Sequence, residues 1–173
     1  MSIKQAKNEN NHDNFAELPS HILKDKYDEL LKLSIHCIKI FNSLCMKVAE
    51  LLLSEFPKNM ELTIYEAIVK KVIEKNYEEP ISLFLVHVFQ NKEYREAIMN
   101  GDENFFKSNR HENLTSSDED RIKAMFQFKS CWNEMNDVSK NYIKEAFKKM
   151  IKVCNTYLDS KCDYNKIGKY LSK

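Results

Sequence analysis

The sequence predicts an all-α protein that folds as a single-domain bundle of about six helices with a long first helix. Its 173 residues include only two glycines and three prolines, the residues that most often mark turns. Apolar side chains recur at steps of three and four over long stretches, as on one face of a helix, and no stretch alternates as a half-buried strand does. A hydrophobic content of 43% is enough for one core.

Residues 1–19 are predicted to be a flexible polar tail, followed by one helical domain at residues 20–173. The tail is rich in Asn, Lys and Glu, so burial cannot offset the entropy of ordering it. Residues 20–56 contain no helix breaker, and Pro57 ends them. One side of this first helix carries Tyr27, Leu31, Ser34, Ile38, Phe41, Cys45, Val48 and Leu52. At 1.5 Å per residue the helix is roughly 50 Å long, so we expect a bend or an exposed end.

Two further helices are predicted before residue 90. Thr63 and Glu66 form a capping box, which predicts that a second amphipathic helix begins there and ends near Asn76. Pro80 suits the first turn of a third helix that continues to Phe89. This third helix is apolar nearly all round, so we expect it to be the buried centre of the bundle.

Residues 91–100 continue as a more polar helix that ends at Gly101, which suits a left-handed C-terminal cap. A short turn follows from Asp102 to Phe106, and then a polar loop at residues 107–117. Ser117 precedes three acidic residues, which predicts a helix start and a helix that continues to Trp132. The terminal part is predicted as a helix at 139–158, starting at Asp137 or Ser139, and a short last helix at 164–171.

The net charge and the cysteines indicate which partners and which cellular compartment to expect. A net charge of +1 argues against a wholesale polyanion binder, although residues 138–173 alone carry +6. The five cysteines form no C-x-x-C pair and no secretory leader precedes them, so we expect reduced thiols and an intracellular compartment, the cytoplasm or a viral replication or assembly site. No apolar run approaches the roughly 20 residues of a membrane span, so no membrane association is expected.

Most catalytic and cofactor-binding patterns are missing, so we expect no enzyme, no catalytic residues and no cofactor. Gly101 and Gly168 stand alone, and a phosphate loop or a dinucleotide fingerprint needs several glycines at fixed spacing. We expect no metal site, because His36 and Cys37 are adjacent and point about 100° apart on a helix. Cys154 and Cys162 are separated by a predicted helix end.

The remaining titratable groups have structural explanations, with one alternative left open. A cysteine and a histidine that meet in space would leave no sequence signature, so a Cys/His nucleophile stays an alternative to ordinary thiols. We expect His87 to be a hydrogen-bonded core histidine, and His111 with Glu112 to be solvated in a polar loop. Two acidic groups are expected at helix starts: Glu78 with Glu79, and Asp118–Asp120. Aromatic residues at helical spacing are expected in the core rather than stacked on bases: Phe105, Phe106, Phe126, Phe128, Trp132, Tyr142 and Phe147.

A row of lysines is the candidate binding feature. Four of them recur at every fourth position and share one helical face: Lys140, Lys144, Lys148 and Lys152. Like charges at this spacing repel each other, and a phosphate backbone, an acidic partner or the acidic part of the chain itself would relieve the repulsion. A row of charges like this one is most often a simply solvated face. The row has no arginine, so any nucleic-acid binding should be independent of sequence.

The order of several short motifs resembles a group of uncharacterised helical proteins of large nucleocytoplasmic DNA viruses. The shared features are Phe56-Pro57 after the first helix, an Asp102-Glu103-x-Phe105-Phe106 segment, and Trp132 with Asn133 and Asn136 before a terminal helix that includes Ile143. The resemblance covers roughly residues 27–158 and departs at Ile143-Lys144-Glu145, where a Trp-Lys-Tyr run is expected. It implies a viral origin and an intracellular setting, and no catalytic residues.

These observations lead to two hypotheses. The first is a non-catalytic interaction protein, structural or accessory, that binds a protein partner or another copy of itself through helix surfaces, either the over-long first helix or the lysine row. The alternative is a sequence-independent nucleic-acid-binding protein that uses Lys140, Lys144, Lys148 and Lys152. Neither hypothesis includes a small-molecule cofactor.

Overall fold

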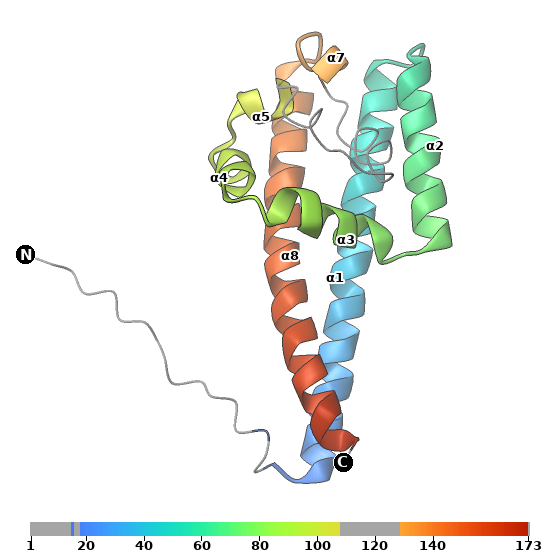
Figure 1. The fold of residues 1–173 in the computed structure, drawn as a ribbon. Coiled ribbons are helices and arrows are strands. Elements are labelled where there is room, and N and C mark those ends of the chain that lie inside the picture. Colours follow the sequence, from blue (N-terminus) through green and yellow to red (C-terminus); the bar gives the residue numbers. More distant parts are fainter. Residues whose placement is uncertain (1–14, 16–17, 108–128, 173) are drawn as a thin grey trace, which may run out of the picture.

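The computed structural model describes residue 15, residues 18–107 and residues 129–172, and these residues form an all-α fold, as predicted (Figure 1). Its helices are α1 (Ser20–Glu55), α2 (Met60–Lys75), α3 (Glu79–Phe84), the π-helical turn η2 (Leu85–Phe89), α4 (Lys92–Asn100), α5 (Glu103–Lys107), α7 (Lys129–Trp132) and α8 (Asp137–Leu171). The predicted loop at 107–117, the predicted helix start at Ser117, His111, Phe126 and Phe128 lie outside the described residues, apart from Lys107.

The first and last helices lie side by side in opposite directions and form an arm that extends beyond the other helices (Figure 1). The prediction of two terminal helices is wrong, because α8 is continuous over 35 residues and contains Gly168. A glycine inside a helix costs roughly 0.5–1 kcal/mol relative to alanine. A Cβ on Gly168 would stand 3.4 Å from Cε2 of Tyr27, which is an ordinary van der Waals contact, so the packing of α8 on α1 leaves room for alanine there. The predicted over-long first helix is therefore covered by α8.

The far end of the arm has its own small apolar cluster. Phe15, Leu23 and Ile167 are buried there. Beside them the rings of Tyr27 and Tyr164 stack with centroids 4.3 Å apart, and the Tyr27 hydroxyl donates to the Tyr164 hydroxyl at 2.6 Å. Of the predicted flexible tail, the structure describes Phe15, Leu18 and Pro19, and Phe15 is buried.

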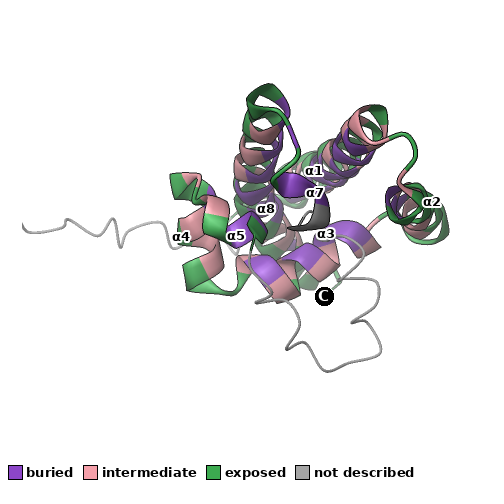
Figure 2. Cartoon of the chain, turned by 90° about the horizontal axis from the view of Figure 1, so that it is seen from above, coloured by how far each residue is buried: buried purple, intermediate pink, exposed green. Residues whose placement is uncertain are grey.

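The main core lies at the opposite end, where the shorter helices pack around α1 and α8 (Figure 2). Trp132 is fully buried and stacks on Phe106 with ring centroids 4.5 Å apart. Phe106 and Phe105 both meet Phe147 of α8 edge to face. The prediction of a core role is confirmed for these four aromatic residues, whereas Tyr142 is 42% exposed.

Asparagine side chains cap the N-termini of three helices, α2, α4 and α8. Asn59 accepts hydrogen bonds from the backbone N–H groups of Glu61 and Leu62, so α2 begins at Met60 and not at the predicted Thr63. The Thr63 hydroxyl instead bonds to the carbonyl oxygen of Asn59 inside the first turn. Asn91 and Asn136 cap α4 and α8 in the same way.

A carboxylate joins the end of α1 to the start of α8. Glu55 accepts hydrogen bonds from the Asn136 amide and from the Ser139 hydroxyl. An acid at this position also faces the positive end of the α8 dipole. This contact joins the last turn of α1 to the first turn of α8.

The five cysteines are all free, and four of them are buried. Cys154 and Cys162 lie on the same helix, so the predicted helix end between them is wrong. Among the described residues, no helix is both long enough and apolar enough to cross a bilayer.

Candidate functional site

The third predicted helix is α-helical at first and ends in a π-helical turn. Its α-helical part ends at Phe84, and the N–H of Gln90 then bonds to the carbonyl oxygen of Leu85 at 3.0 Å, five residues earlier. Such turns are frequent at functional sites. The helix is not buried all round as predicted: Ile81, Phe84 and Val88 are buried, whereas Val86 is 55% exposed.

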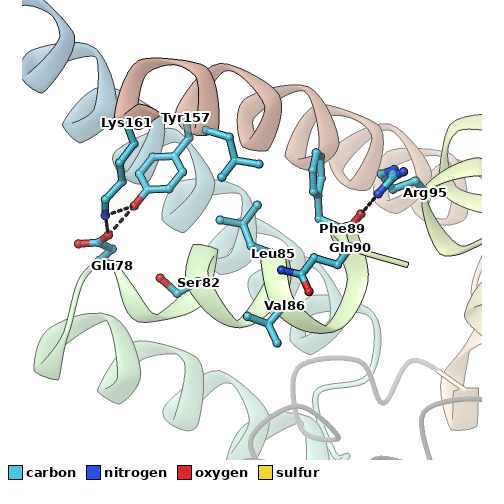
Figure 3. A pocket seen from close by; sticks show the side chains of 10 residues that line it. Glu78, Ser82, Leu85, Val86, Phe89, Gln90, Arg95, Tyr157 and Lys161 are labelled. Carbon is cyan, nitrogen blue, oxygen red and sulfur yellow. Dashed lines mark hydrogen bonds and ion pairs between the residues drawn. The ribbon is translucent and has the colours of Figure 1, made fainter. Parts of the chain in front are cut away.

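The exposed side of this helix and one turn of α8 line a cavity of about 560 Å³, which we call the α3–α8 groove. Its lining residues are Glu78, Ser82, Leu85, Val86, Phe89, Gln90, Arg95, Tyr157, Leu158 and Lys161. Apolar side chains occupy the middle, Glu78, Tyr157 and Lys161 lie at one end, and Arg95 lies at the other (Figure 3). This volume lies in the range of ligand pockets, which are also mainly apolar with a few polar groups.

Three polar side chains at the first end bond to one another. The Tyr157 hydroxyl and the Lys161 ammonium both donate to Oε1 of Glu78, and the ammonium also donates to the Tyr157 hydroxyl at 2.7 Å. The Lys161 and Tyr157 hydrogen bonds hold the pKa of Glu78 below its ordinary value. Burial, followed by the hydrogen bond to Glu78, raises the pKa of Tyr157.

This arrangement does not activate the tyrosine. A lysine one helical turn from a tyrosine can prepare the tyrosine for acid–base catalysis, because the positive charge of the lysine lowers the pKa of the phenol. Here Glu78 neutralises Lys161, and the pKa of Tyr157 is raised instead. The phenol therefore stays protonated at neutral pH, and the three groups are suited to hold the end of the groove in place.

The other end of the groove presents a cation, Arg95, that has no acidic partner among the described residues. Arg95 donates through Nη1 to the carbonyl oxygen of Phe89, and its guanidinium lies over the Phe89 ring, 5.2 Å from the centroid. Within the described part of the chain no carboxylate pairs with Arg95. A guanidinium fixed by a ring and a carbonyl, with other N–H groups left over, is suited to bind a carboxylate.

The four predicted lysines share one face of α8, but that face is partly covered. Lys144 bonds to Glu103 of α5 at 2.9 Å, and Lys148 bonds to Glu145 at 2.8 Å. Lys140 lies 3.9 Å from Asp137. The side chains of these three lysines are only 17–27% exposed, and Lys152 alone of the four is classed as exposed.

The turn between α4 and α5 is the element that covers the row. A Cβ on Gly101 would stand 3.8 Å from Nζ of Lys148 and 3.9 Å from Cδ of Lys144. Hydrogen bonds from Lys144 and Lys107 lower the pKa of Glu103 to about 2. Glu103 from the acidic part of the chain therefore neutralises Lys144, while Glu145 of the same helix pairs with Lys148.

The four buried thiols do not have the environment of an activated nucleophile. Burial raises the pKa of Cys45 to about 12 and that of Cys131 to about 11, and it also raises the pKa values of Cys37 and Cys154. No group of three or more histidine, cysteine or acidic side chains within the described segments is arranged to hold a metal ion. His87 is half-buried on η2.

Sequence reasoning did not identify the groove. Glu78 was interpreted as a helix-start acid, and it does stand at the N-terminus of α3. The spacing of Tyr157 and Lys161 indicates that they are neighbours on a helix, but their partner Glu78 is 79 residues away from Tyr157. Nothing in the sequence predicts the π-helical turn at Leu85–Phe89.

Comparison with protein-family models, with curated proteins and with solved structures gives no match for this chain. The resemblance to helical proteins of large DNA viruses stays a prediction.

Proposed function

We propose that the protein is a non-catalytic interaction protein, structural or accessory in role, that binds a protein partner through the α3–α8 groove. The observation that carries this proposal is an open, mainly apolar groove whose polar end is neutralised internally. Val86 and Leu158 at the groove are 55% and 41% exposed. Exposed apolar side chains that line a hollow are typical of surfaces that dock another protein.

The shape of the groove favours a helix as the docked element. From Glu78 to Gln90 the groove follows α3 and η2 for twelve steps along the chain, which is at most about 18 Å at the α-helical rise of 1.5 Å per residue. A partner helix would place apolar side chains at i, i+4 and i+7 along this length. Such a partner contacts Leu85, Phe89 and Leu158 and leaves its polar face in water.

Binding of an apolar anionic dye, anilinonaphthalene sulfonate, tests the groove directly. We expect the full-length protein to enhance the fluorescence of the dye, because the groove offers an apolar surface beside the Arg95 guanidinium. Leu158→Glu should remove most of the enhancement. Val138→Glu is the matched control, since Val138 is 81% exposed on the same helix and does not line the groove. Equal enhancement by wild type and Leu158→Glu would refute the proposal.

Sequence-independent nucleic-acid binding remains the second candidate, and the lysine row is its only support. Anisotropy of labelled DNA over a salt series distinguishes the two. Because three of the four lysines pair with acids of the chain, we expect little binding at low salt. Tight binding that weakens steeply with salt, and is lost in Lys148→Glu/Lys152→Glu, would favour the nucleic-acid hypothesis.

We also propose an intracellular, reducing setting, in the cytoplasm or at a viral replication or assembly site. Five free thiols support a reducing compartment. The viral origin rests on the resemblance in the motifs around Phe56-Pro57, Phe105-Phe106 and Trp132.

A further inference from the structure

The first helix carries a second row of mainly apolar side chains, besides the row that packs on α8. Its members recur at alternating steps of three and four, which is the spacing of a helix face that packs against another helix. We call this row the outer seam, and its members are Leu30, Leu33, Cys37, Ile40, Leu44, Lys47 and Leu51. Leu33 and Ile40 are 38% and 37% exposed, so the middle of the seam is open to a partner.

The outer seam lies on the side of α1 away from α2 and α3. Asn42 marks the covered side, because its side-chain amide donates to the carbonyl oxygen of Tyr77, which follows α2. Ile40 precedes Asn42 by two residues and therefore points about 160° away from it, at 3.6 residues per turn. Figure 2 shows α3, α4 and α5 together on one side of the α1–α8 pair. The exposed members of the seam therefore face solvent in the single chain.

Two outer seams can pack on each other in opposite directions. Their apolar members match when Leu33 lies on Leu44 of the second copy and Ile40 lies on Cys37. A two-fold axis repeats both contacts, so the consecutive layers in the middle of the seam are all apolar. The charged member, Lys47, falls outside these layers at each end.

The position of Lys47 favours this register over the alternatives. Here Lys47 lies over Leu30 and next to Glu29 of the second copy. Glu29 and Lys47 are both exposed, and neither forms an ion pair within the described part of the chain. Glu50 follows Lys47 by three residues, so each Lys47 lies between two carboxylates.

Other pairings of the two seams are less favourable. A shift by one heptad in one direction brings Lys47 onto Cys37, in the middle of the seam. A shift in the other direction separates Lys47 from Glu29. A parallel pairing puts Lys47 opposite Lys47 of the second copy, where the like charges repel.

We infer that the protein forms a symmetric dimer in which two copies pack their outer seams antiparallel. The contact is isologous and closed, so it gives dimers and no longer oligomers. The inference goes beyond the proposed function, because the α3–α8 groove lies on the α3 side of the α1–α8 pair and stays open in the dimer. One helix face is a small interface, so the dimer dissociates on dilution.

Sedimentation velocity of the full chain, from micromolar to millimolar concentration, tests the inference. The wild type should change from monomer to dimer over this range. Ile40→Glu should stay monomeric, because it buries a charge in a central layer. Ile64→Glu is the matched control, since Ile64 is 56% exposed on α2 and lies outside the seam and the groove, so this variant should dimerise like the wild type. Both variants should still bind the dye, because the groove is unchanged.

A disulfide tests the register without a loss of folding. In a Cys162→Ser background, Leu33→Cys/Leu44→Cys should form a covalent dimer on mild oxidation, because the two positions face each other across the axis. Leu33→Cys alone should not, since position 33 faces position 44 and not itself.

Charge reversal tests the ends of the seam. Glu29→Lys and Lys47→Glu should each weaken the dimer about three- to tenfold, and the two changes in one chain should restore most of the affinity. A wild type that stays monomeric at millimolar concentration would overturn the inference. So would a dimer that Ile40→Glu leaves intact, because such a dimer uses another surface.

Discussion

At the scale of single residues, several lysines of this protein are neutralised by carboxylates of the same chain. Glu78 neutralises Lys161 at one end of the groove, and Glu103 neutralises Lys144 under the turn between α4 and α5. The lysine spacing predicted one shared face, and that part is confirmed. The partner Glu103 is 41 residues away from Lys144, so its contact depends on tertiary structure that the sequence does not display.

Glu103 makes the stability of the fold sensitive to acid. Its pKa is about 2, below the ordinary value of 4.5. A carboxylate whose folded-state pKa is depressed stabilises the protein above the unfolded pKa, and this contribution is lost as the pH falls from about 4.5 to about 2. In urea titrations at neutral and acid pH, Glu103→Gln should therefore lose less stability on acidification than the wild type. The contribution is modest because the side chain is 40% exposed. An identical pH dependence of the two proteins would contradict this role.

The thiols give a second test at the residue scale. Cys162 is exposed, and the other four cysteines are buried with raised pKa values. A thiol reagent at neutral pH should label one cysteine per chain quickly, and Cys162→Ser should abolish that fast phase. A second fast thiol in the folded protein would support the Cys/His alternative.

At the scale of helices, the two glycines have opposite roles. Gly101 ends α4 with a φ of +69°, as its position after a polar helix predicted. Gly168 lies inside α8, where the same residue type was interpreted as part of a separate short helix. The sequence alone does not tell a glycine that ends a helix from one that lies inside a helix. For Gly168 the difference depends on how α8 packs beside Tyr27, which is a tertiary contact.

Alanine at the two glycines should therefore act in opposite directions. Gly101→Ala should lower the free energy of unfolding by about 1 kcal/mol, because a Cβ is strained in the left-handed region. Gly168→Ala should be neutral or stabilising by up to about 1 kcal/mol, since a Cβ at 3.4 Å from Tyr27 is tolerated and alanine favours the helix. Gly168→Leu is the control, because its larger side chain must displace Tyr27. Thermal and urea unfolding measure all three, and a stabilising Gly101→Ala would contradict the assignment.

At the scale of the whole molecule, the fold is an antiparallel pair of long helices with the shorter helices packed at one end. The apolar periodicity of residues 20–56 predicted α1 almost to the residue. The periodicity of the C-terminal segment did not predict that α8 is continuous along α1, because polar residues near Cys162 and Gly168 conceal the apolar spacing there. The groove was missed for a different reason: its lining residues come from α3, η2, α4 and α8, and they share one cavity only after α3 crosses the pair of long helices (Figure 1).

The core at the crowded end should dominate global stability. Trp132 is fully buried, stacks on Phe106, and belongs to the cluster that joins α1, α5 and α8. Trp132→Ala should cost about 3–5 kcal/mol, which is a large part of the stability of a domain this size. The matched control is Tyr142→Ala, since Tyr142 is 42% exposed on α8 and should change stability much less. Urea unfolding with similar losses for both variants would contradict the placement of the core.

The most direct test of the central claim, that the α3–α8 groove is the binding surface, is a chemical-shift map of the labelled full-length protein titrated with anilinonaphthalene sulfonate. The account predicts that the largest amide shifts fall in residues 78–95 and 157–161, which line the groove. Shifts confined to the Lys140–Lys152 face, or to the arm around Tyr27 and Tyr164, would contradict it.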